Sequence, residues 1–211
     1  MIVLDGMPGA GKTTLLHRLR TALPDHLVVF PEAQPPEETS SDAETARFLL
    51  GKARDRIDAA RHLARTRPDL LVASDRCHIG VLAYRYALAA TGRAPRSNFE
   101  HALALCHDLD LIHPHPDLTT LVLLTDPGTS ITRRAAYAHD QRHSLWFGHG
   151  FLTAYRDFLD NLPDWLPAGT FTSLDVTDTS GWLALLDALP SHLVRQLPPR
   201  KALTGRSSEA V

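Results

Sequence analysis

A short glycine-rich segment near the N-terminus carries residue types that could bind a chain of phosphates. The pattern G-x-x-x-x-G-K-[ST] is matched by Gly6, Gly11, Lys12 and Thr13, and in this pattern backbone N–H groups surround the β-phosphate of a nucleotide. The ammonium of Lys12 would reach the β- and γ-phosphates, and the hydroxyl of Thr13 would be a ligand of Mg²⁺. The loop residues expected to contact the nucleotide also include Gly9, Ala10 and Thr14. The segment therefore predicts a site for ATP and Mg²⁺.

The flanking sequence supplies the two elements that such a loop requires. Residues 2–5 form an apolar run suited to a buried strand, and residues 12–22 can form a helix directly behind the loop. The N-terminus of a helix offers unpaired N–H groups and the positive end of the helix dipole, and both favour a bound anion. Because strand and helix are both in place, a chance glycine-rich turn is the weaker interpretation.

Two acidic residues lie where predicted strands end. Asp75 follows the apolar run 70–74, and Glu32 follows the run 27–30 after one proline. Because the carboxyl ends of parallel strands share one edge of a sheet, both carboxylates should face the phosphate loop. Asp75 could hold Mg²⁺ through water, and Glu32 could orient an acceptor hydroxyl and accept its proton. The alternatives are a helix cap for Asp75 and an ordinary loop position for Glu32.

Arginines near these carboxylates could stabilise the charge of a transferred phosphoryl group. Arg76 directly follows Asp75, and its guanidinium could bind an acceptor phosphate or the developing charge through two parallel hydrogen bonds. Arg133 and Arg134 follow the fourth apolar run on a predicted helix, and Arg142 lies beyond it. Arginines that close over ATP act in this way in other enzymes. Because helix arginines are more often solvated, we expect one of the last three to be catalytic.

The predicted helix 42–66 carries a second row of arginines. Arg47, Arg54 and Arg61 recur every seven residues and therefore share roughly one face. This face could border an acceptor pocket, and a solvated stripe explains the spacing about as well. Tyr84, on the next predicted helix, could stack on an acceptor ring, although core packing is the safer interpretation.

Apolar runs alternate with helical patterns along the whole chain. We expect strands at 2–5, 27–30, 70–74, 121–125 and 171–176, and helices at 12–22, 42–66, 78–90, 97–109, 128–140, 149–161 and 180–195. Strands separated by helices pair in parallel through right-handed crossovers, which predicts a three-layer α/β fold. We expect one domain over residues 1–196, in which the irregular segment at about 137–150 forms a lid. Residues 197–211 should form a flexible tail.

Composition limits the classes of partner. The 22 Lys and Arg residues nearly balance the 24 Asp and Glu residues, so no overall positive field argues for nucleic acid. No apolar stretch approaches the roughly 20 residues of a membrane span. The 2 cysteines are too few for a disulfide framework, and the 12 histidines show no clear zinc-ligand spacing. We expect a cytoplasmic protein that acts on a small molecule, with no nucleic-acid or membrane partner.

Together these motifs resemble the thymidylate kinase and deoxynucleoside kinase group of phosphate-loop kinases. The resemblance is carried by residues 6–14, the Asp75-Arg76 pair, Tyr84 and the stretch Pro127–Arg133. It implies a five-stranded parallel sheet in the order 2-3-1-4-5 with a helical lid, and a homodimer formed through the helices that flank the third strand. It also implies roles for matching residues: ATP and Mg²⁺ at Lys12 and Thr13, metal-bound water and the acceptor at Asp75 and Arg76, and the start of the lid at Arg133.

Two departures from this group bear on the acceptor. Thymidylate kinases usually have an Arg-Glu-Pro-Gly-like segment after the second strand, whereas this chain has Pro31-Glu32-Ala33-Gln34-Pro35. This difference weakens a monophosphate acceptor and resembles the nucleoside branch, in which a glutamate at this place acts as a base. The second lid arginine of the group falls near Tyr137, so Arg142 would have to replace it.

The leading hypothesis is an ATP-dependent kinase that transfers the γ-phosphate to a nucleoside hydroxyl or to a nucleoside monophosphate. The main alternative is a kinase of the same fold that acts on an antibiotic or another secondary metabolite. A regulatory NTPase is the hypothesis from a different class. The absence of an Asn-Lys-x-Asp motif after the fourth strand, and the arginine-rich lid segment, favour a kinase over such a switch.

Overall fold

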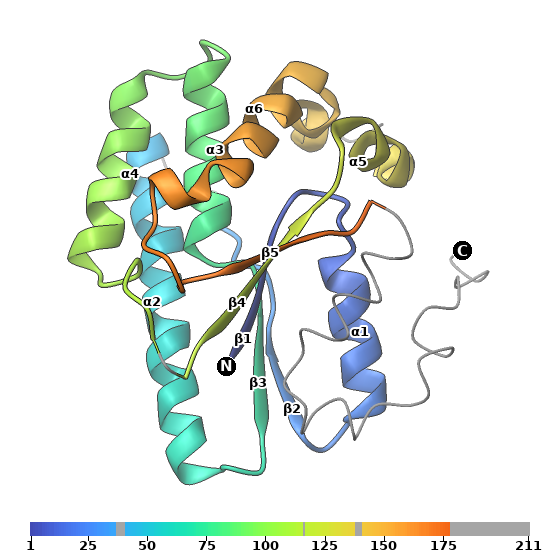
Figure 1. The fold of residues 1–211 in the computed structure, drawn as a ribbon, viewed down its shortest axis with the longest axis vertical. Coiled ribbons are helices and arrows are strands. Elements are labelled where there is room, and N and C mark those ends of the chain that lie inside the picture. The colour runs from blue at the N-terminus through green and yellow to red at the C-terminus, as the bar shows by residue number, and fades with distance from the viewer. Residues whose placement is uncertain (37–40, 116, 138–140, 178–211) are drawn as a thin grey trace.

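A computed structural model describes residues 1–36, 41–115, 117–137 and 141–177 of the 211-residue chain. Its strands are β1 (Ile2–Gly6), β2 (Leu27–Phe30), β3 (Leu71–Asp75), β4 (Thr119–Leu124) and β5 (Thr172–Asp175). They form one five-stranded parallel sheet in the order β2-β3-β1-β4-β5 (Figure 1). The predicted α/β class and the predicted strand order are both confirmed.

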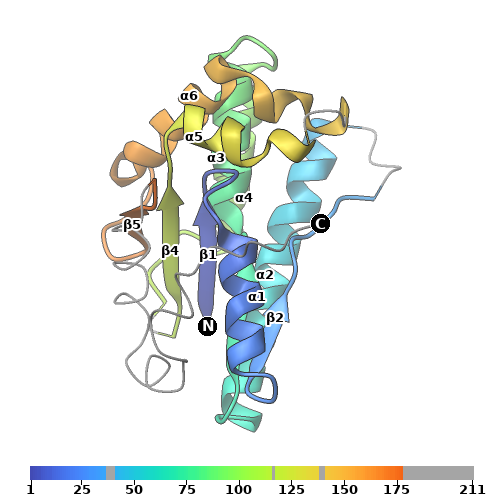
Figure 2. The ribbon, with the colours of Figure 1, turned by 90° about the vertical axis from the view of Figure 1, so that its right-hand side faces the viewer.

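Helices cover both faces of the sheet and its carboxyl edge. They are α1 (Lys12–Ala22), α2 (Asp42–Thr66), α3 (His78–Ala90), α4 (Arg96–Asp108), α5 (Pro127–Arg133) and α6 (His149–Asp160), with 3-10 turns η1 (Ala135–Tyr137), η2 (Gln141–Phe147) and η3 (Leu162–Asp164). Helix α1 lies on one face of the sheet, and α2, α3 and α4 lie on the other (Figure 1, Figure 2). Helices α5 and α6 lie beyond the carboxyl ends of the strands, close to the loop between β1 and α1.

The core surrounds the central strand β1. Val3 and Leu4 are completely buried, as expected for a parallel strand that helices cover on both sides. Leu4 pairs with Asp75 of β3, and Asp5 pairs with Val122 of β4. This register brings the end of β3 beside the start of the phosphate loop, which is the arrangement that the sequence predicts.

The predicted helix 128–140 is wrong after Arg133. Helix α5 ends there, and the backbone N–H of Arg134 donates to the carbonyl of Ile131 at 3.1 Å, the tighter pattern of a 3-10 turn. Three of its seven residues are β-branched, and such residues lower helix propensity. The predicted helix 180–195 and the predicted tail 197–211 lie outside the described residues.

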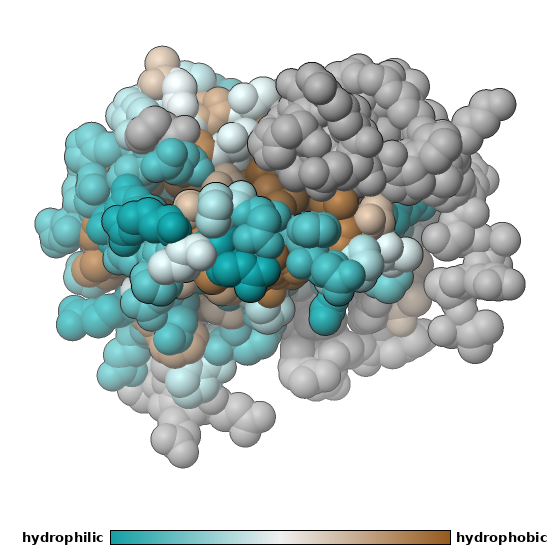
Figure 3. All heavy atoms as spheres, turned by 90° about the horizontal axis from the view of Figure 1, so that it is seen from below, coloured by the Kyte–Doolittle hydropathy of each residue, from teal (hydrophilic) through white to brown (hydrophobic). Residues whose placement is uncertain are grey.

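Seen from below, the described residues are mainly hydrophilic, with smaller hydrophobic areas between them (Figure 3). Among the described residues, no helix combines the length and the apolar character needed to span a membrane.

Candidate active site

The phosphate loop turns sharply between β1 and α1, and glycine is required where it does so. Gly6 has a φ of 111°, and a Cβ at this position would lie 2.2 Å from the carbonyl oxygen of Leu123. The loop is fixed to β4, because the N–H of Met7 donates to the same carbonyl at 2.8 Å. Gly11, with a φ of 86°, is the N-cap of α1 and starts the helix that would face the phosphates.

Lys12 is folded back onto the loop. Its Nζ is buried and donates to the carbonyl oxygens of Gly6 at 3.1 Å and Met7 at 2.7 Å. Burial, and next the positive charge of Arg76, lower the pKa of Lys12 to about 7. Phosphate oxygens at the loop would give the ammonium charged acceptors in place of neutral carbonyls.

Thr13 and Asp75 lie side by side where the sequence predicts a metal site. Thr13 Oγ1 donates to Asp75 Oδ2 at 2.9 Å. Asp75 Oδ1 is buried and has no hydrogen-bond partner within the part of the chain that the structure describes. A buried carboxylate oxygen without a partner is costly, and oxygen donors of this kind suit Mg²⁺. The oxygens of Thr13 and Asp75 therefore fit Mg²⁺. A separate site made of three or more His, Cys, Asp or Glu side chains is not found among the described residues.

Glu32 and Arg76 form a close ion pair at the same edge of the sheet. Arg76 Nε lies 2.5 Å from Glu32 Oε1, and the two side chains are 18% and 44% exposed, respectively. Burial opposes the charge of Arg76, but Glu32 and other negative groups still raise its pKa above the ordinary value. The φ of Arg76 is 64°, a left-handed conformation that is strained for a residue with a side chain and is common at functional sites.

Arg56 of α2, which no sequence motif singles out, forms hydrogen bonds with the two segments that carry Glu32 and Arg76. Its guanidinium donates to the carbonyl oxygens of Asp75 and Arg76, each at 3.4 Å, and to the carbonyl oxygen of Pro31. Ser74 Oγ also donates to the Arg76 carbonyl, at 2.9 Å. These bonds join the segment that carries Glu32 to the strained turn that carries Arg76.

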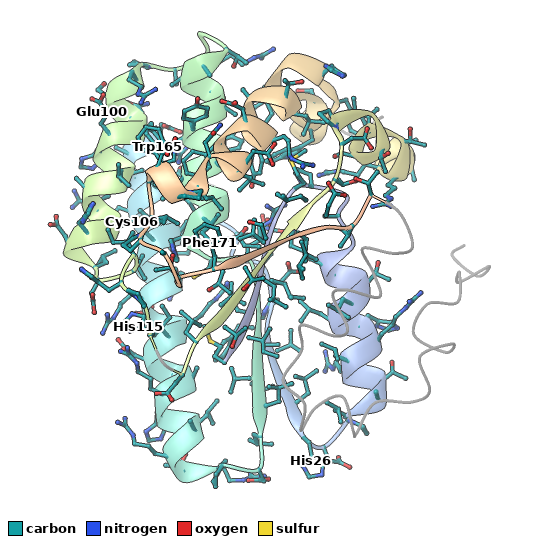
Figure 4. All side chains as sticks on the ribbon, in the orientation of Figure 1. His26, Glu100, Cys106, His115, Trp165 and Phe171 are labelled. Carbon is teal, nitrogen blue, oxygen red and sulfur yellow. The ribbon has the colours of Figure 1, made fainter. Side chains whose placement is uncertain are left out.

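Of the two interpretations of the arginine row on α2, the contacts of Arg54 and Arg61 support a solvated stripe over a border of the acceptor pocket. Arg54 Nε pairs with Asp58 at 3.0 Å, and Arg54 Nη1 approaches Asp110 at 3.5 Å. Arg61 Nη2 lies 2.7 Å from Nδ1 of His115, which is drawn beside α2 and far from α5 (Figure 4). Spacing alone identified one face of α2, but Arg56 on another face is the residue that reaches the site.

Asp5 is a second functional candidate that the sequence analysis missed. It is completely buried and accepts hydrogen bonds from the N–H groups of Gly6 at 2.8 Å, Cys77 at 3.0 Å and Gly80 at 2.9 Å. Burial raises the pKa of Asp5, and the charge of Arg76 opposes this shift. Because Cys77 is the N-cap of α3, Asp5 ties the phosphate loop to the start of that helix. An acid directly before the first glycine of the loop was the available signal.

Helix α5 supports the phosphate loop from outside. Ser130 Oγ donates to the carbonyl of Pro8 at 2.7 Å. Arg133 donates to the carbonyl oxygens of Val176 at 3.2 Å, Thr177 at 2.8 Å and Gly9 at 3.4 Å. Arg133 is thus bound to backbone oxygens at the end of β5. Arg142 belongs to η2, but its side chain lies outside what the structure describes.

Aromatic rings close the site on the side of α3 and α6. Tyr155 Oη is within 3.5 Å of Arg76 Nη1, and the Cζ of Arg76 lies 5.9 Å from the ring centre of Trp146. Tyr84 packs against Trp146 and Phe151, with 5.5 Å between ring centres in each case. Tyr84 therefore lies in an aromatic cluster beside Arg76, which is compatible with both predicted interpretations of this residue.

Comparisons with solved structures identify the same architecture in kinases. The chain is similar to a deoxyadenosine kinase from M. mycoides with the products dCMP and dCDP bound, with a TM-score of 0.63 and 14% identity over 90% of this chain and 98% of that one. The same enzyme with dATP gives a TM-score of 0.55 and 13% identity over 88% and 97% of the two chains, and with dCTP a TM-score of 0.51 and 14% identity over 90% and 100%. No protein-family model matches the sequence, and the search of curated proteins gives no match. The comparisons establish the fold expected from the resemblance.

Proposed function

We propose that the protein is an ATP-dependent phosphotransferase that moves the γ-phosphate of ATP to a hydroxyl group of a nucleoside-type acceptor. The observation that carries this proposal is the pairing of Glu32 with Arg76 at the sheet edge that also holds the phosphate loop. A loop for the triphosphate, a carboxylate for the hydroxyl and a cation between them are the parts that such a transfer requires.

Each group has a defined part in the transfer. The phosphate loop and Lys12 bind the triphosphate, and Thr13 and Asp75 would hold Mg²⁺, which neutralises phosphate charge when it is bound. Glu32 orients the acceptor hydroxyl and takes its proton as the new oxygen–phosphorus bond forms and the bond to the leaving ADP breaks. Arg76 stabilises the charge that spreads over the transferred group.

The ion pair also favours a hydroxyl acceptor over a monophosphate. A monophosphate at this place would bring its negative charge against the carboxylate of Glu32, whereas a hydroxyl can donate its proton to it. The nucleotides named for the neighbours, dCMP, dCDP, dATP and dCTP, support a nucleoside-type ligand. A kinase for an antibiotic or another secondary metabolite would use the same groups, so it is kept as the second candidate.

The test is ADP release from Mg·ATP with a pool of nucleosides and, separately, a pool of nucleoside monophosphates. Turnover only with nucleosides is the expected result and supports Glu32 as the base. Turnover only with monophosphates would overturn the hydroxyl acceptor. A lack of turnover with both pools would overturn the nucleoside assignment and favour the second candidate.

A further inference from the structure

The indole of Trp146 lies between two arginines that come from different parts of the chain. The ring centre is 5.9 Å from Cζ of Arg76 and 5.7 Å from Cζ of Arg134. Trp146 is held in place by three other rings, at 5.5 Å from Tyr84, 5.4 Å from Phe151 and 5.8 Å from Tyr155, measured between ring centres. The three rings fix the position of the indole, and the indole in turn contacts two guanidinium groups, those of Arg76 and Arg134.

The two arginines belong to the two halves of the site. Arg76 pairs with Glu32, the proposed base for the acceptor. Arg134 follows α5, and its Cγ lies 3.4 Å from the place that a Cβ on Gly9 would occupy. Trp146 thus bridges the acceptor side, marked by Glu32, and the nucleotide side, marked by the phosphate loop.

Arg134 and its neighbour Arg133 differ in what they contact. Arg133 donates to three backbone carbonyls, two of them at the end of β5, which fixes its guanidinium there. The guanidinium of Arg134 also reaches the ring of Trp146, and Arg133 makes no contact of that kind within the part of the chain that the structure describes. The motif resemblance points to Arg133 as the start of the lid, and the contact with Trp146 adds Arg134 beside it as a candidate.

An aromatic face is a suitable support for two like charges. A guanidinium over an indole is attracted to the negative face of the ring, and the attraction grows when the contact is shielded from water. This attraction holds the guanidinium groups of Arg76 and Arg134 at the indole of Trp146. Phosphoryl transfer gains most from positive groups that are already in position, because no reorganisation is then needed.

We propose that Trp146 is a positioning residue that holds Arg134 and Arg76 on the two sides of the transferred phosphoryl group. This inference rests on the phosphotransferase function proposed above. It assigns the arginine that follows α5 as a phosphate ligand and identifies an aromatic residue that links it to the acceptor side.

Binding of ADP with and without aluminium fluoride tests the proposal without any acceptor. Aluminium fluoride beside ADP imitates the transferred group, so the tightening that it causes measures how well the surrounding positive groups are placed for that group. In titration calorimetry we expect W146L and R134A to bind ADP within about twofold of wild type and to lose the tightening by about tenfold or more. W146F, which keeps a ring face, should retain most of it.

Trp165→Leu is the matched control. Trp165 also carries an arginine, since Cζ of Arg96 lies 5.6 Å from its ring centre, but it is drawn beside α4 on the far side from α5 (Figure 4). W165L should keep the full tightening. Equal losses in W165L and W146L would overturn the proposal by showing a general packing effect.

The double variant W146L/R134A adds a second criterion. If Trp146 acts through Arg134, the double variant should lose no more than about twice what the worse single variant loses, whereas independent residues give losses that multiply. Multiplying losses, or a wild type that shows no tightening by aluminium fluoride, would contradict the proposal. The titration needs no acceptor, so its outcome does not depend on whether nucleosides are the acceptor. A failure to phosphorylate nucleosides would overturn the proposed function and leave this test of Trp146 unaffected.

Discussion

Replacing Glu32 by glutamine isolates the chemistry at the acceptor, because the side chain keeps its size and loses its charge. The carboxylate lies 2.5 Å from Arg76 Nε, beside the phosphate loop. Loss of a general base lowers kcat by about 10²–10⁴-fold, which corresponds to about 2.7–5.5 kcal/mol in activation free energy. We expect E32Q to show this loss in kcat with nucleosides, and a KM for ATP close to that of wild type, since the loop residues are unchanged.

The same substitution should alter stability only slightly. The Glu32 side chain is 44% exposed, so water screens its pair with Arg76 and the pair contributes about 1 kcal/mol or less. For a domain of this size, that amount corresponds to a change in Tm of about 2–4 °C. A large kinetic loss with a small thermal shift would separate catalysis from structural support.

Steady-state ADP release and thermal melting, with Glu100→Gln as the control, measure both quantities. Glu100 is 64% exposed and pairs with Arg96 at 3.7 Å on α4, away from the loop (Figure 4). E100Q should therefore match wild type in kcat and Tm. If E32Q keeps kcat within about threefold of wild type, or within about 0.7 kcal/mol, the assignment of Glu32 as a base is refuted.

Three further predictions concern the groups around Glu32. Because burial lowers the pKa of Lys12 to about 7, nucleotide binding at pH 8 should take up a proton as the ammonium re-forms; calorimetry in buffers of different ionisation enthalpy measures this, and no uptake would contradict the pKa. D75N should raise the Mg²⁺ concentration for half-maximal activity about 10–100-fold, and an unchanged requirement would exclude Asp75 from the metal site. R56A should lower kcat by about tenfold or more by loosening the Glu32–Arg76 pair, whereas R54A on the same helix should leave it unchanged; equal effects would count against a positioning role.

Local patterns in the sequence were sufficient for the fold and for the phosphate loop. The glycines, Lys12 and Thr13 are consecutive or nearly so, and the β1-loop-α1 unit forms within 22 residues. Alternating strands and helices leave few arrangements for a parallel sheet. The resemblance to phosphate-loop kinases then supplied the strand order, which the structure has. Asp75 and Glu32 were predictable because the ends of parallel strands share an edge.

The arginines and aromatic residues were not predictable in the same way. Arg56, Arg54 and Arg61 all lie on α2, and only the packing of this helix decides which one reaches the turn at Arg76. The role proposed for Trp146 depends on its contacts with Arg76 and Arg134, which are far apart from one another in the sequence. Contacts of this kind depend on tertiary structure and leave no periodic signal in the sequence.

Transfer of label from γ-labelled ATP tests the central claim most directly. The purified protein is incubated with Mg·ATP and a nucleoside, and the labelled products are separated and identified by mass. The account predicts label on a hydroxyl of the nucleoside, and formation of this product about 10²–10⁴-fold more slowly with E32Q. Label that appears only in inorganic phosphate, or only on an added nucleoside monophosphate, would contradict a hydroxyl kinase that uses Glu32 as its base.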